Sequence, residues 1–134
     1  MYLAVLSNDK KHLFLDLELY MSKVDGEFSE EEKQIIDTHC LEMRIDNNNY
    51  ENEYSIDELF CTLKNSLTVQ EAHIFFLELA ATVLADNAYH VAEKKLLNQF
   101  ASVLSIPENE VEEAILLIKR IKCVYEDCAN YIKE

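Results

Sequence analysis

Glycine and proline are nearly absent from this sequence, which has one of each among its 134 residues and no tryptophan. Sheet proteins depend on tight hairpin turns, and those turns need residues such as glycine that tolerate a positive φ. A single glycine also cannot form a glycine-rich phosphate loop or the Gly-x-Ser-x-Gly turn of many hydrolases. Because 49% of the residues are hydrophobic, the chain still has enough apolar side chains for a core. The composition therefore predicts an all-α protein.

Basic residues are scarce as well, since 12 Lys and Arg stand against 26 Asp and Glu for a formal net charge of −14. Proteins that bind nucleic acid place Lys and Arg against its phosphates, and anionic membrane surfaces attract the same side chains. We therefore expect neither as a partner. The acidic charge favours a cation or a basic protein surface, or it serves only to keep the domain soluble.

Long apolar runs are missing too. The longest one, residues 74–85, contains Glu78 and is too short to span a bilayer. The apolar stretch at residues 1–6 meets Asp9 too soon for a signal peptide. No Cys-x-x-Cys pair exists, so the cysteines are expected to be free thiols: Cys40, Cys61, Cys123 and Cys128. These features predict a cytoplasmic protein that does not insert into a membrane.

Helix starts are marked by the pattern Ser/Thr-x-x-Glu, in which a hydroxyl and a carboxylate satisfy the first backbone N–H groups of a helix. The pattern begins at Ser29, Ser55, Thr68 and Ser105. Together with the helical spacing of apolar residues, it predicts one domain of about six helices over residues 1–134. The expected helices cover residues 8–24, 30–44, 56–66, 69–85, 91–104 and 106–132. The Asn-rich segment 46–54 is predicted to be an exposed, mobile loop.

The fourth and sixth of these helices differ in their apolar patterns. The fourth is apolar nearly all round and is expected at the centre of the bundle. The sixth carries an apolar stripe along one side, which either packs on the core or binds a partner, and we favour packing. The stripe consists of Val111, Ala114, Ile115, Ile118, Ile121, Val124 and Tyr125.

The sequence also repeats itself at an offset of 61 residues, where segment 25–33 aligns with segment 86–94. Acidic residues and one aromatic residue fall at matching places in the two segments, and the apolar register continues beyond them. Each half therefore consists of a helix, a short acidic corner and a second helix. We predict two similar helical hairpins, at about residues 8–44 and 69–104, which are related by a pseudo-two-fold axis. Both acidic corners should then lie on one patch of surface.

The repeated corner has two interpretations. In the structural one, Gly26 or Asn87 ends the first helix in the left-handed conformation and a Glu caps the next helix. In the other, the carboxylates supply the oxygen ligands that a hard divalent cation prefers, Ca²⁺ before others. The ligand set of the second interpretation is Asp25, Glu27, Glu31, Glu32, Asp86 and Glu93. A complete EF-hand is not expected, because Met21 and Lys23 occupy the positions of its first ligands.

The two corners resemble the TerB-like family, named for tellurite-resistance proteins, whose members carry an Asp-Gly-x-hydrophobic-x-x-x-Glu corner twice. Segment 105–113 is similar to the start of that family's last helix. The resemblance implies a compact helical bundle in a bacterial, cytoplasmic, non-catalytic protein. It also implies links to stress responses, acidic metal-binding surfaces and multi-protein assemblies. The first corner keeps Asp25 and Gly26, whereas the second has Asn87 in place of the glycine.

Motifs of catalysis are absent, including the Glu-x-x-His and His-Glu-x-x-His spacings of metal enzymes. Glu18 and Glu78 stand in apolar helices and are the best candidates for buried carboxylates, which would do acid–base chemistry only if they met in a closed pocket. We therefore predict a non-catalytic binding module, with a divalent cation as its only cofactor and with another protein or a second copy of itself as its partner. The alternative is a purely structural dimerisation or scaffold module without a ligand.

Overall fold

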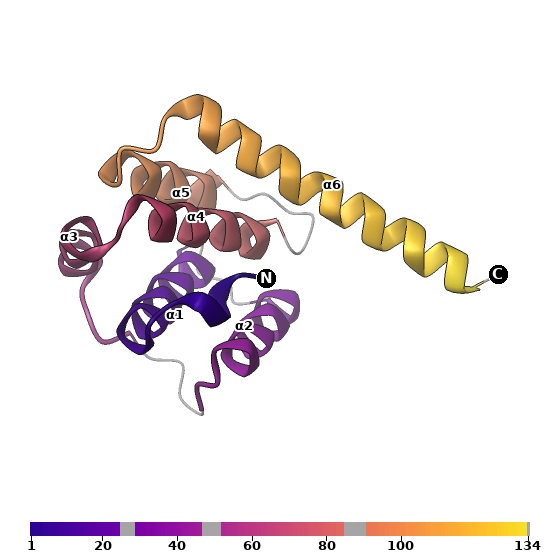
Figure 1. Ribbon diagram of the computed structural model, residues 1–134, viewed down its shortest axis with the longest axis horizontal. Helices are drawn as coiled ribbons and strands as arrows, with labels where there is room; N and C mark the ends of the chain where they lie inside the picture. Colours follow the sequence, from indigo (N-terminus) through magenta and orange to yellow (C-terminus); the bar gives the residue numbers. More distant parts are fainter. Residues whose placement is uncertain (25–28, 47–51, 85–90, 134) are drawn as a thin grey trace.

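A computed structural model of the chain describes residues 1–24, 29–46, 52–84 and 91–133, and within these ranges every regular element is a helix. A short 3-10 helix, η1, precedes six α-helices, which confirms the all-α prediction (Figure 1). The elements are η1 (Leu3–Val5), α1 (Asn8–Lys23), α2 (Glu30–Met43), α3 (Ile56–Ser66), α4 (Val69–Val83), α5 (Val91–Val103) and α6 (Glu108–Lys133).

The helices begin where hydroxyl and carboxylate side chains satisfy the first backbone N–H groups. Ser29 and Glu32 form a complete capping box at the start of α2, and Thr68 and Glu71 form another at the start of α4. Ser55 accepts a hydrogen bond from the third residue of α3 in the same way. Local sequence therefore sets the starts of these three helices.

Two helices end on non-glycine residues in the left-handed conformation, Arg44 after α2 (φ 59°) and Ser105 after α5 (φ 57°). After each helix, the following isoleucine donates its N–H to a carbonyl five residues back, from Ile45 to Cys40 and from Ile106 to Ala101, both at 2.9 Å. This is the bonding pattern of a Schellman end, which usually has glycine in the left-handed position. Ser105 therefore belongs to the end of α5, and α6 begins at Glu108, two residues after the predicted start.

The internal repeat has a counterpart in the element boundaries. The helices α1 and α4 begin 61 residues apart, as do α2 and α5. The left-handed residues Arg44 and Ser105 stand at the same offset. The two hairpins thus share their helix starts and the end of the second helix, while the acidic corners at residues 25–28 and 85–90 lie outside the described residues.

The helix α4 is the centre of the bundle, as its apolar composition predicts, and it contacts α1, α2, α5 and α6. Its Phe75 ring forms a T-shaped pair with Phe14 from α1 at 5.3 Å between centroids, and it stacks with Phe100 from α5 at 6.4 Å. Aromatic pairs in these geometries add to the free energy already gained by burying the rings. The core therefore joins both hairpins through one aromatic cluster.

The end of the predicted loop 46–54 is held by a buried aspartate of α1. Asp16 accepts hydrogen bonds from the Asn52 side chain at 2.7 Å and from the backbone N–H groups of Glu53 and Tyr54 at 3.1 and 3.3 Å. Residues 47–51 of this segment lie outside the described residues. Asp16 thus sets the path by which the chain enters α3.

Candidate functional site

The predicted cation ligands are only partly within the described residues. Asp25, Glu27 and Asp86 lie outside them, so their distance from one another is not defined. Glu31 is exposed in the first turn of α2, and Glu93 is buried in the first turn of α5. The part of the chain that the structure describes contains no group of three His, Cys, Asp or Glu side chains that could hold a metal ion. The divalent-cation site stays a prediction.

For Glu32, the structural interpretation of the corner holds. Its side chain is only 2% exposed and accepts a hydrogen bond from the N–H of Ser29 at 3.4 Å. The Ser29 hydroxyl accepts one in return from the N–H of Glu32 at 3.1 Å. A buried carboxylate that caps its own helix is poorly placed to coordinate an ion from solvent.

The structure brings together the two carboxylates that the sequence singled out, Glu18 of α1 and Glu78 of α4, with a histidine between them. His39 of α2 lies with its Nδ1 at 2.6 Å from Glu18 Oε2 and its Nε2 at 3.5 Å from Glu78 Oε2. All three side chains are buried. We call these three residues the Glu–His–Glu cluster, and it connects the three helices that carry them.

Neighbouring groups complete this cluster. The Thr82 hydroxyl donates to Glu18 Oε2 at 2.6 Å, and Phe14 packs its ring edge-on against His39 at 5.7 Å. The second oxygen of Glu18 and the hydroxyl of Ser22 are buried without a hydrogen-bond partner in the described part of the chain. Polar atoms of that kind are rare in folded proteins because desolvation is costly. The cluster is therefore a group of buried polar side chains where α1, α2 and α4 meet.

The ionisation of His39 follows from these contacts. Burial disfavours the charged imidazolium, but the hydrogen bond with Glu18 and the negative charges of Glu18 and Glu78 outweigh burial and raise the pKa of His39 above its ordinary value of 6.5. The positive α-amino group of Met1 acts weakly in the opposite direction. The raised pKa of His39 therefore favours its charged form between the carboxyl groups of Glu18 and Glu78.

The same cluster holds the segment before α1. Glu78 Oε1 accepts a hydrogen bond from the N–H of Tyr2 at 2.8 Å, and Glu42 accepts one from the N–H of Leu3 at 2.9 Å. Both carboxylates also lie near the α-amino nitrogen of Met1, at 2.9 and 3.0 Å. Burial raises the pKa of Glu42, but the α-amino charge and the hydrogen bonds outweigh burial and lower it. Glu78 thus links His39 to η1.

Acid–base chemistry would require that a substrate reach this cluster. Among the surface grooves lined by described residues are four whose linings include none of Glu18, His39 and Glu78. Every oxygen of Glu78 and both nitrogens of His39 already have partners inside the protein. The contacts of the Glu–His–Glu cluster therefore serve to connect α1, α2 and α4.

His39 was not among the candidate site residues predicted from the sequence. A signal was present, because His39 follows Ile36 by three residues and precedes Met43 by four, which puts all three on one face of α2. Both apolar neighbours are buried. A histidine on that face has to find polar partners inside the core.

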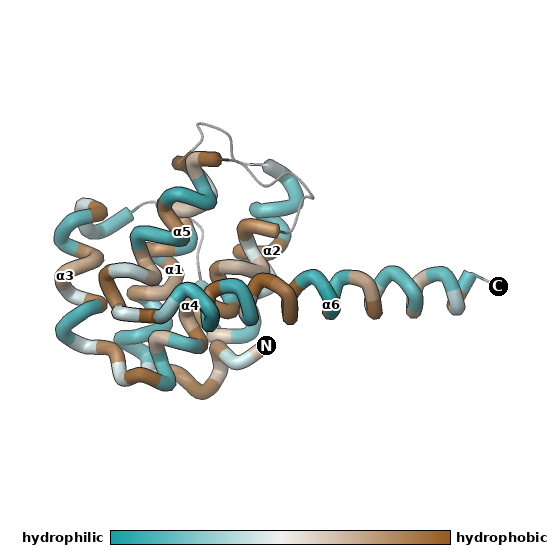
Figure 2. Tube along the Cα trace, turned by 90° about the horizontal axis from the view of Figure 1, so that it is seen from above, coloured by the Kyte–Doolittle hydropathy of each residue, from teal (hydrophilic) through white to brown (hydrophobic). Residues whose placement is uncertain are grey.

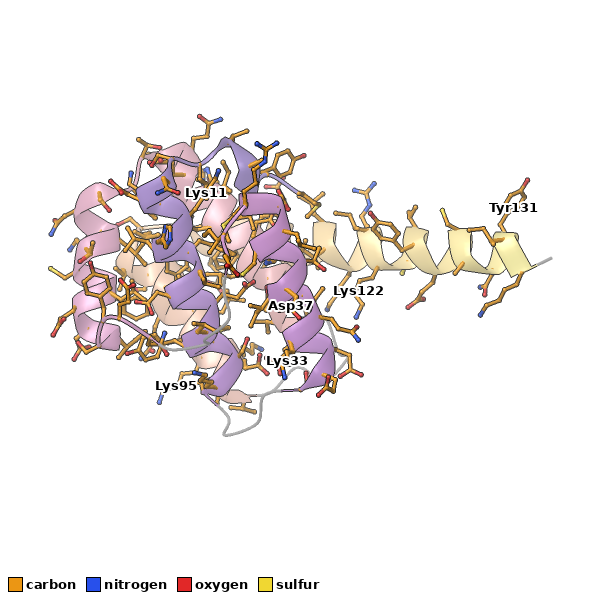
Figure 3. All side chains as sticks on the ribbon, turned by 90° about the horizontal axis from the view of Figure 1, so that it is seen from below. Lys11, Lys33, Asp37, Lys95, Lys122 and Tyr131 are labelled. Carbon is orange, nitrogen blue, oxygen red and sulfur yellow. The ribbon has the colours of Figure 1, made fainter. Side chains whose placement is uncertain are left out.

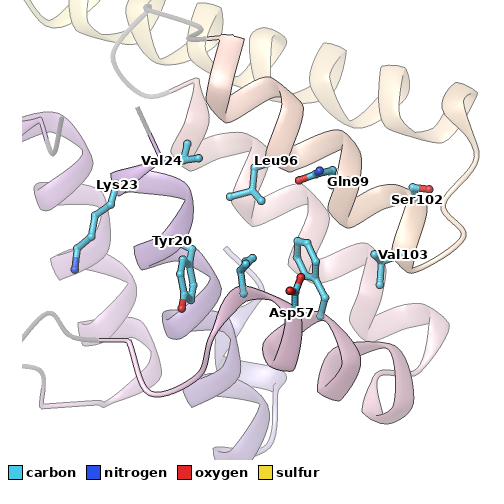
Figure 4. A pocket seen from close by; sticks show the side chains of 10 residues that line it. Tyr20, Lys23, Val24, Asp57, Leu96, Gln99, Ser102 and Val103 are labelled. Carbon is cyan, nitrogen blue, oxygen red and sulfur yellow. The ribbon is translucent and has the colours of Figure 1, made fainter. Parts of the chain in front are cut away.

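Two of the grooves lie between helices of the bundle and include residues of α5 or α6. The larger, of about 580 Å³, lies among α1, α3 and α5, and Figure 4 shows Tyr20, Leu96 and Val103 around it. The smaller, which we call the α6 groove, has a volume of about 270 Å³ and lies between α4 and α6. It is lined by His73, Phe76, Leu77, Ile106, Glu110, Glu113, Ala114 and Leu117. Its walls are mainly apolar, with the His73–Glu110 pair joined at 2.8 Å.

The last helix belongs to the bundle along only part of its length. Figures 1 and 2 show α6 crossing the bundle and then projecting away from the other helices. Val111 and Ile118 are buried and Ile121 packs on the core, and Lys122 donates to the carbonyl of Leu84 at 2.5 Å. Every residue from 123 to 133 is exposed. We call residues 123–133 the α6 arm.

The prediction that the whole stripe of this helix packs on the core is therefore wrong for its last members. Val124 and Tyr125 are exposed, and so are Tyr131 and Ile132 farther along the arm. Figure 3 shows Tyr131 near the end of the helix, well beyond Lys122. Helical periodicity identifies an apolar face, but it does not show where the surface that covers this face stops. None of the described helices is long and apolar enough to cross a bilayer.

Comparison with known proteins identifies a solved structure with a similar fold. No family profile and no curated protein matches the chain. Among solved structures, it is similar to the crystal structure of a tellurite resistance protein from Nostoc punctiforme, with a TM-score of 0.70 and 20% sequence identity over 96% of this chain and 82% of the other. At that identity the similarity concerns the arrangement of helices alone. The chain therefore has the fold of a tellurite resistance protein, which confirms the TerB-like fold implied by its repeated corners.

Proposed function

We propose that this protein is a non-catalytic interaction module that binds a protein partner through the α6 arm. The observation that carries the proposal is that every residue from 123 to 133 is exposed, including four large apolar side chains. These are Val124, Tyr125, Tyr131 and Ile132. Contiguous exposed apolar surface on a water-soluble domain is typical of a binding site.

The stability of the arm supports a partner as well. A helical segment of this length, without tertiary contacts, is marginal in water because its propensity alone barely offsets the loss of backbone entropy. Each large apolar side chain that a partner buries contributes roughly 1.5–3 kcal/mol if burial is complete. A partner helix or groove would therefore stabilise the arm and gain affinity from the same contacts.

The rest of the molecule supports a binding role over a catalytic one. The Glu–His–Glu cluster uses its polar atoms to join α1, α2 and α4, and the four grooves do not include it. The structural neighbour is described as a tellurite resistance protein, so we place this binding role in a bacterial stress response. The net charge of −14 favours neutral or basic partner surfaces.

A photo-crosslinking experiment tests the proposal. A photoreactive amino acid replaces Tyr125 in the full chain, and in a matched variant it replaces Leu41, which is similarly exposed but lies on α2. Irradiation of cells that make the protein should give a discrete protein adduct from position 125 and none from position 41. Absence of any adduct from position 125, with protein or with a second copy, would contradict the proposal.

A further inference from the structure

The apolar residues of α6 follow a coiled-coil spacing. From Ala114 onward they recur at alternating steps of three and four residues, which is the a/d pattern of a heptad repeat. The members are Ala114, Leu117, Ile121, Val124, Cys128 and Tyr131. Ala114 and Leu117 also line the α6 groove. One apolar seam therefore begins in the groove beside α4 and continues along the exposed arm, and its members Ala114 and Ile121 also pack partly on the core.

We propose that the partner of this seam is a second copy of the chain, whose α6 lies antiparallel to the first. The inference rests on the proposed function, because it names the partner of the same surface. In an antiparallel pair, a residue at an a position meets a d residue of the other helix. The register that aligns the seams puts Ile121 opposite Val124, Leu117 opposite Cys128, and Ala114 opposite Tyr131 of the second copy.

Charge supports this orientation. Arg120 and Asp127 are exposed, and both stand at the position that immediately precedes an a residue of the seam. In the antiparallel register, Arg120 of each copy faces Asp127 of the other, and the two-fold symmetry makes this pair twice. In a parallel pair, Arg120 would face Tyr125 and Asp127 would face Ile132, so neither charge would find its opposite. Complementary flanking charges set partner choice and orientation in coiled coils.

The α6 groove supports the same pairing from the side of the bundle. The register brings Tyr131 of the second copy to Ala114, at the mouth of the groove, where Phe76, Leu77 and Ile106 provide apolar walls. The carboxylate of Glu113, which also lines the groove, can accept a hydrogen bond from the tyrosine hydroxyl, while the apolar walls pack against the ring.

The length of the seam explains why the groove is needed. The paired segment, residues 114–131, extends over about 27 Å of helix and holds fewer heptads than most isolated coiled coils. Since each arm would end on the bundle of the other copy, the dimer would bury groove and seam together. Both copies would contribute the same surface, as a closed two-fold dimer requires.

Sedimentation of the purified full chain over a dilution series tests the dimer, and a charge exchange tests its register. Arg120→Glu and Asp127→Arg, made singly, should each weaken dimerisation about tenfold, because they put like charges opposite one another. The double variant should restore the wild-type dissociation constant. Exchanging Lys119 and Glu126 in the same manner is the matched control, because both are exposed on the outer face of the helix and should leave dimerisation unchanged.

A disulfide experiment tests the orientation independently. In a background with Cys61→Ser and Cys123→Ser, oxidation with diamide should crosslink the Leu117→Cys variant through Cys128 of the other copy, and should leave the background protein uncrosslinked. Rapid crosslinking of Cys128 in the background protein would show a parallel pair and overturn the proposal. A chain that stays monomeric while position 125 crosslinks to another protein would also overturn it, with the proposed function intact. A monomer without any adduct would overturn both.

Discussion

The Glu–His–Glu cluster and the α6 arm place polar and apolar side chains in opposite ways. The cluster buries Glu18, His39 and Glu78 at the junction of three helices, where burial of charge is costly. The arm exposes Tyr125, Tyr131 and other large apolar side chains, where contact with water is unfavourable. In the first region the cost is offset inside the same chain, by hydrogen bonds and opposite charges. In the second nothing within the described residues offsets it, which is why we assign binding to the arm.

The largest expected effect comes from removing the histidine of the Glu–His–Glu cluster. His39→Ala leaves the carboxylates of Glu18 and Glu78 buried without the imidazolium between them, and should lower the free energy of unfolding by about 3–5 kcal/mol. Urea denaturation followed by circular dichroism measures this loss. His73→Ala is the matched control, since His73 is half exposed in its pair with Glu110 and should cost about 1 kcal/mol or less. Equal losses in the two variants would contradict a special role for the buried pair.

A smaller effect is expected at Asp16, the other buried acid of α1. Asp16→Ala removes the acceptor for the N–H groups of Glu53 and Tyr54 and should cost about 1–3 kcal/mol in unfolding free energy. Amide hydrogen exchange at residues 52–54 should rise more than exchange in α4. Asp57→Ala, at an exposed aspartate of α3, provides the comparison and should leave exchange at residues 52–54 unchanged.

The cluster also predicts a pH dependence of stability. The folded-state pKa of His39 lies above 6.5, so the folded chain holds the proton more tightly than the unfolded chain does. This contribution to stability is complete below pH 6.5 and is lost as pH rises through the folded-state pKa. The free energy of unfolding should therefore fall as pH rises from 6.5 through the folded-state pKa of His39. His39→Gln should remove that slope below pH 8.0, above which the α-amino group of Met1 adds a slope of the same sign.

The smallest effect is expected on the stability of the isolated domain when the arm is changed. Val124→Ser together with Tyr131→Ser should alter the monomer's free energy of unfolding by no more than about 0.5 kcal/mol each, because neither side chain is packed. Ile118→Ser, in the buried part of the same helix, should cost several times more. Thermal denaturation of dilute protein compares the two. A large loss from the arm substitutions would mean that the arm contributes to the fold of its own bundle.

Much of the fold could be predicted from local sequence. The starts of α2, α3 and α4 followed from Ser29, Ser55 and Thr68, because a cap is made within four consecutive residues. The offset of 61 residues anticipated that α1 and α4, and likewise α2 and α5, begin at equivalent places. Ser105 was misjudged because the same Ser-x-x-Glu pattern occurs at a Schellman end, where bonds back to α5 decide the geometry.

The candidate sites could be predicted only in part. Glu18 and Glu78 were recognised as buried acids because they stand in apolar helices, but the histidine that joins them comes from a third helix. Its position depends on how α1, α2 and α4 pack, which no local pattern encodes. The cation ligands were predicted from a corner motif, and the structure gives Glu32 a capping role that the motif also allows.

By itself, the sequence determined that the chain is helical, acidic and built from two similar hairpins, since composition, caps and periodicity act over a few residues at a time. Tertiary structure alone decided which apolar residues of α6 are covered and which polar residues of α1, α2 and α4 meet. The coverage of α6 depends on where the neighbouring helices end, and the contacts among the polar residues depend on how α1, α2 and α4 pack. Val124 and Ile118 share one periodic stripe, yet only Ile118 lies against the bundle.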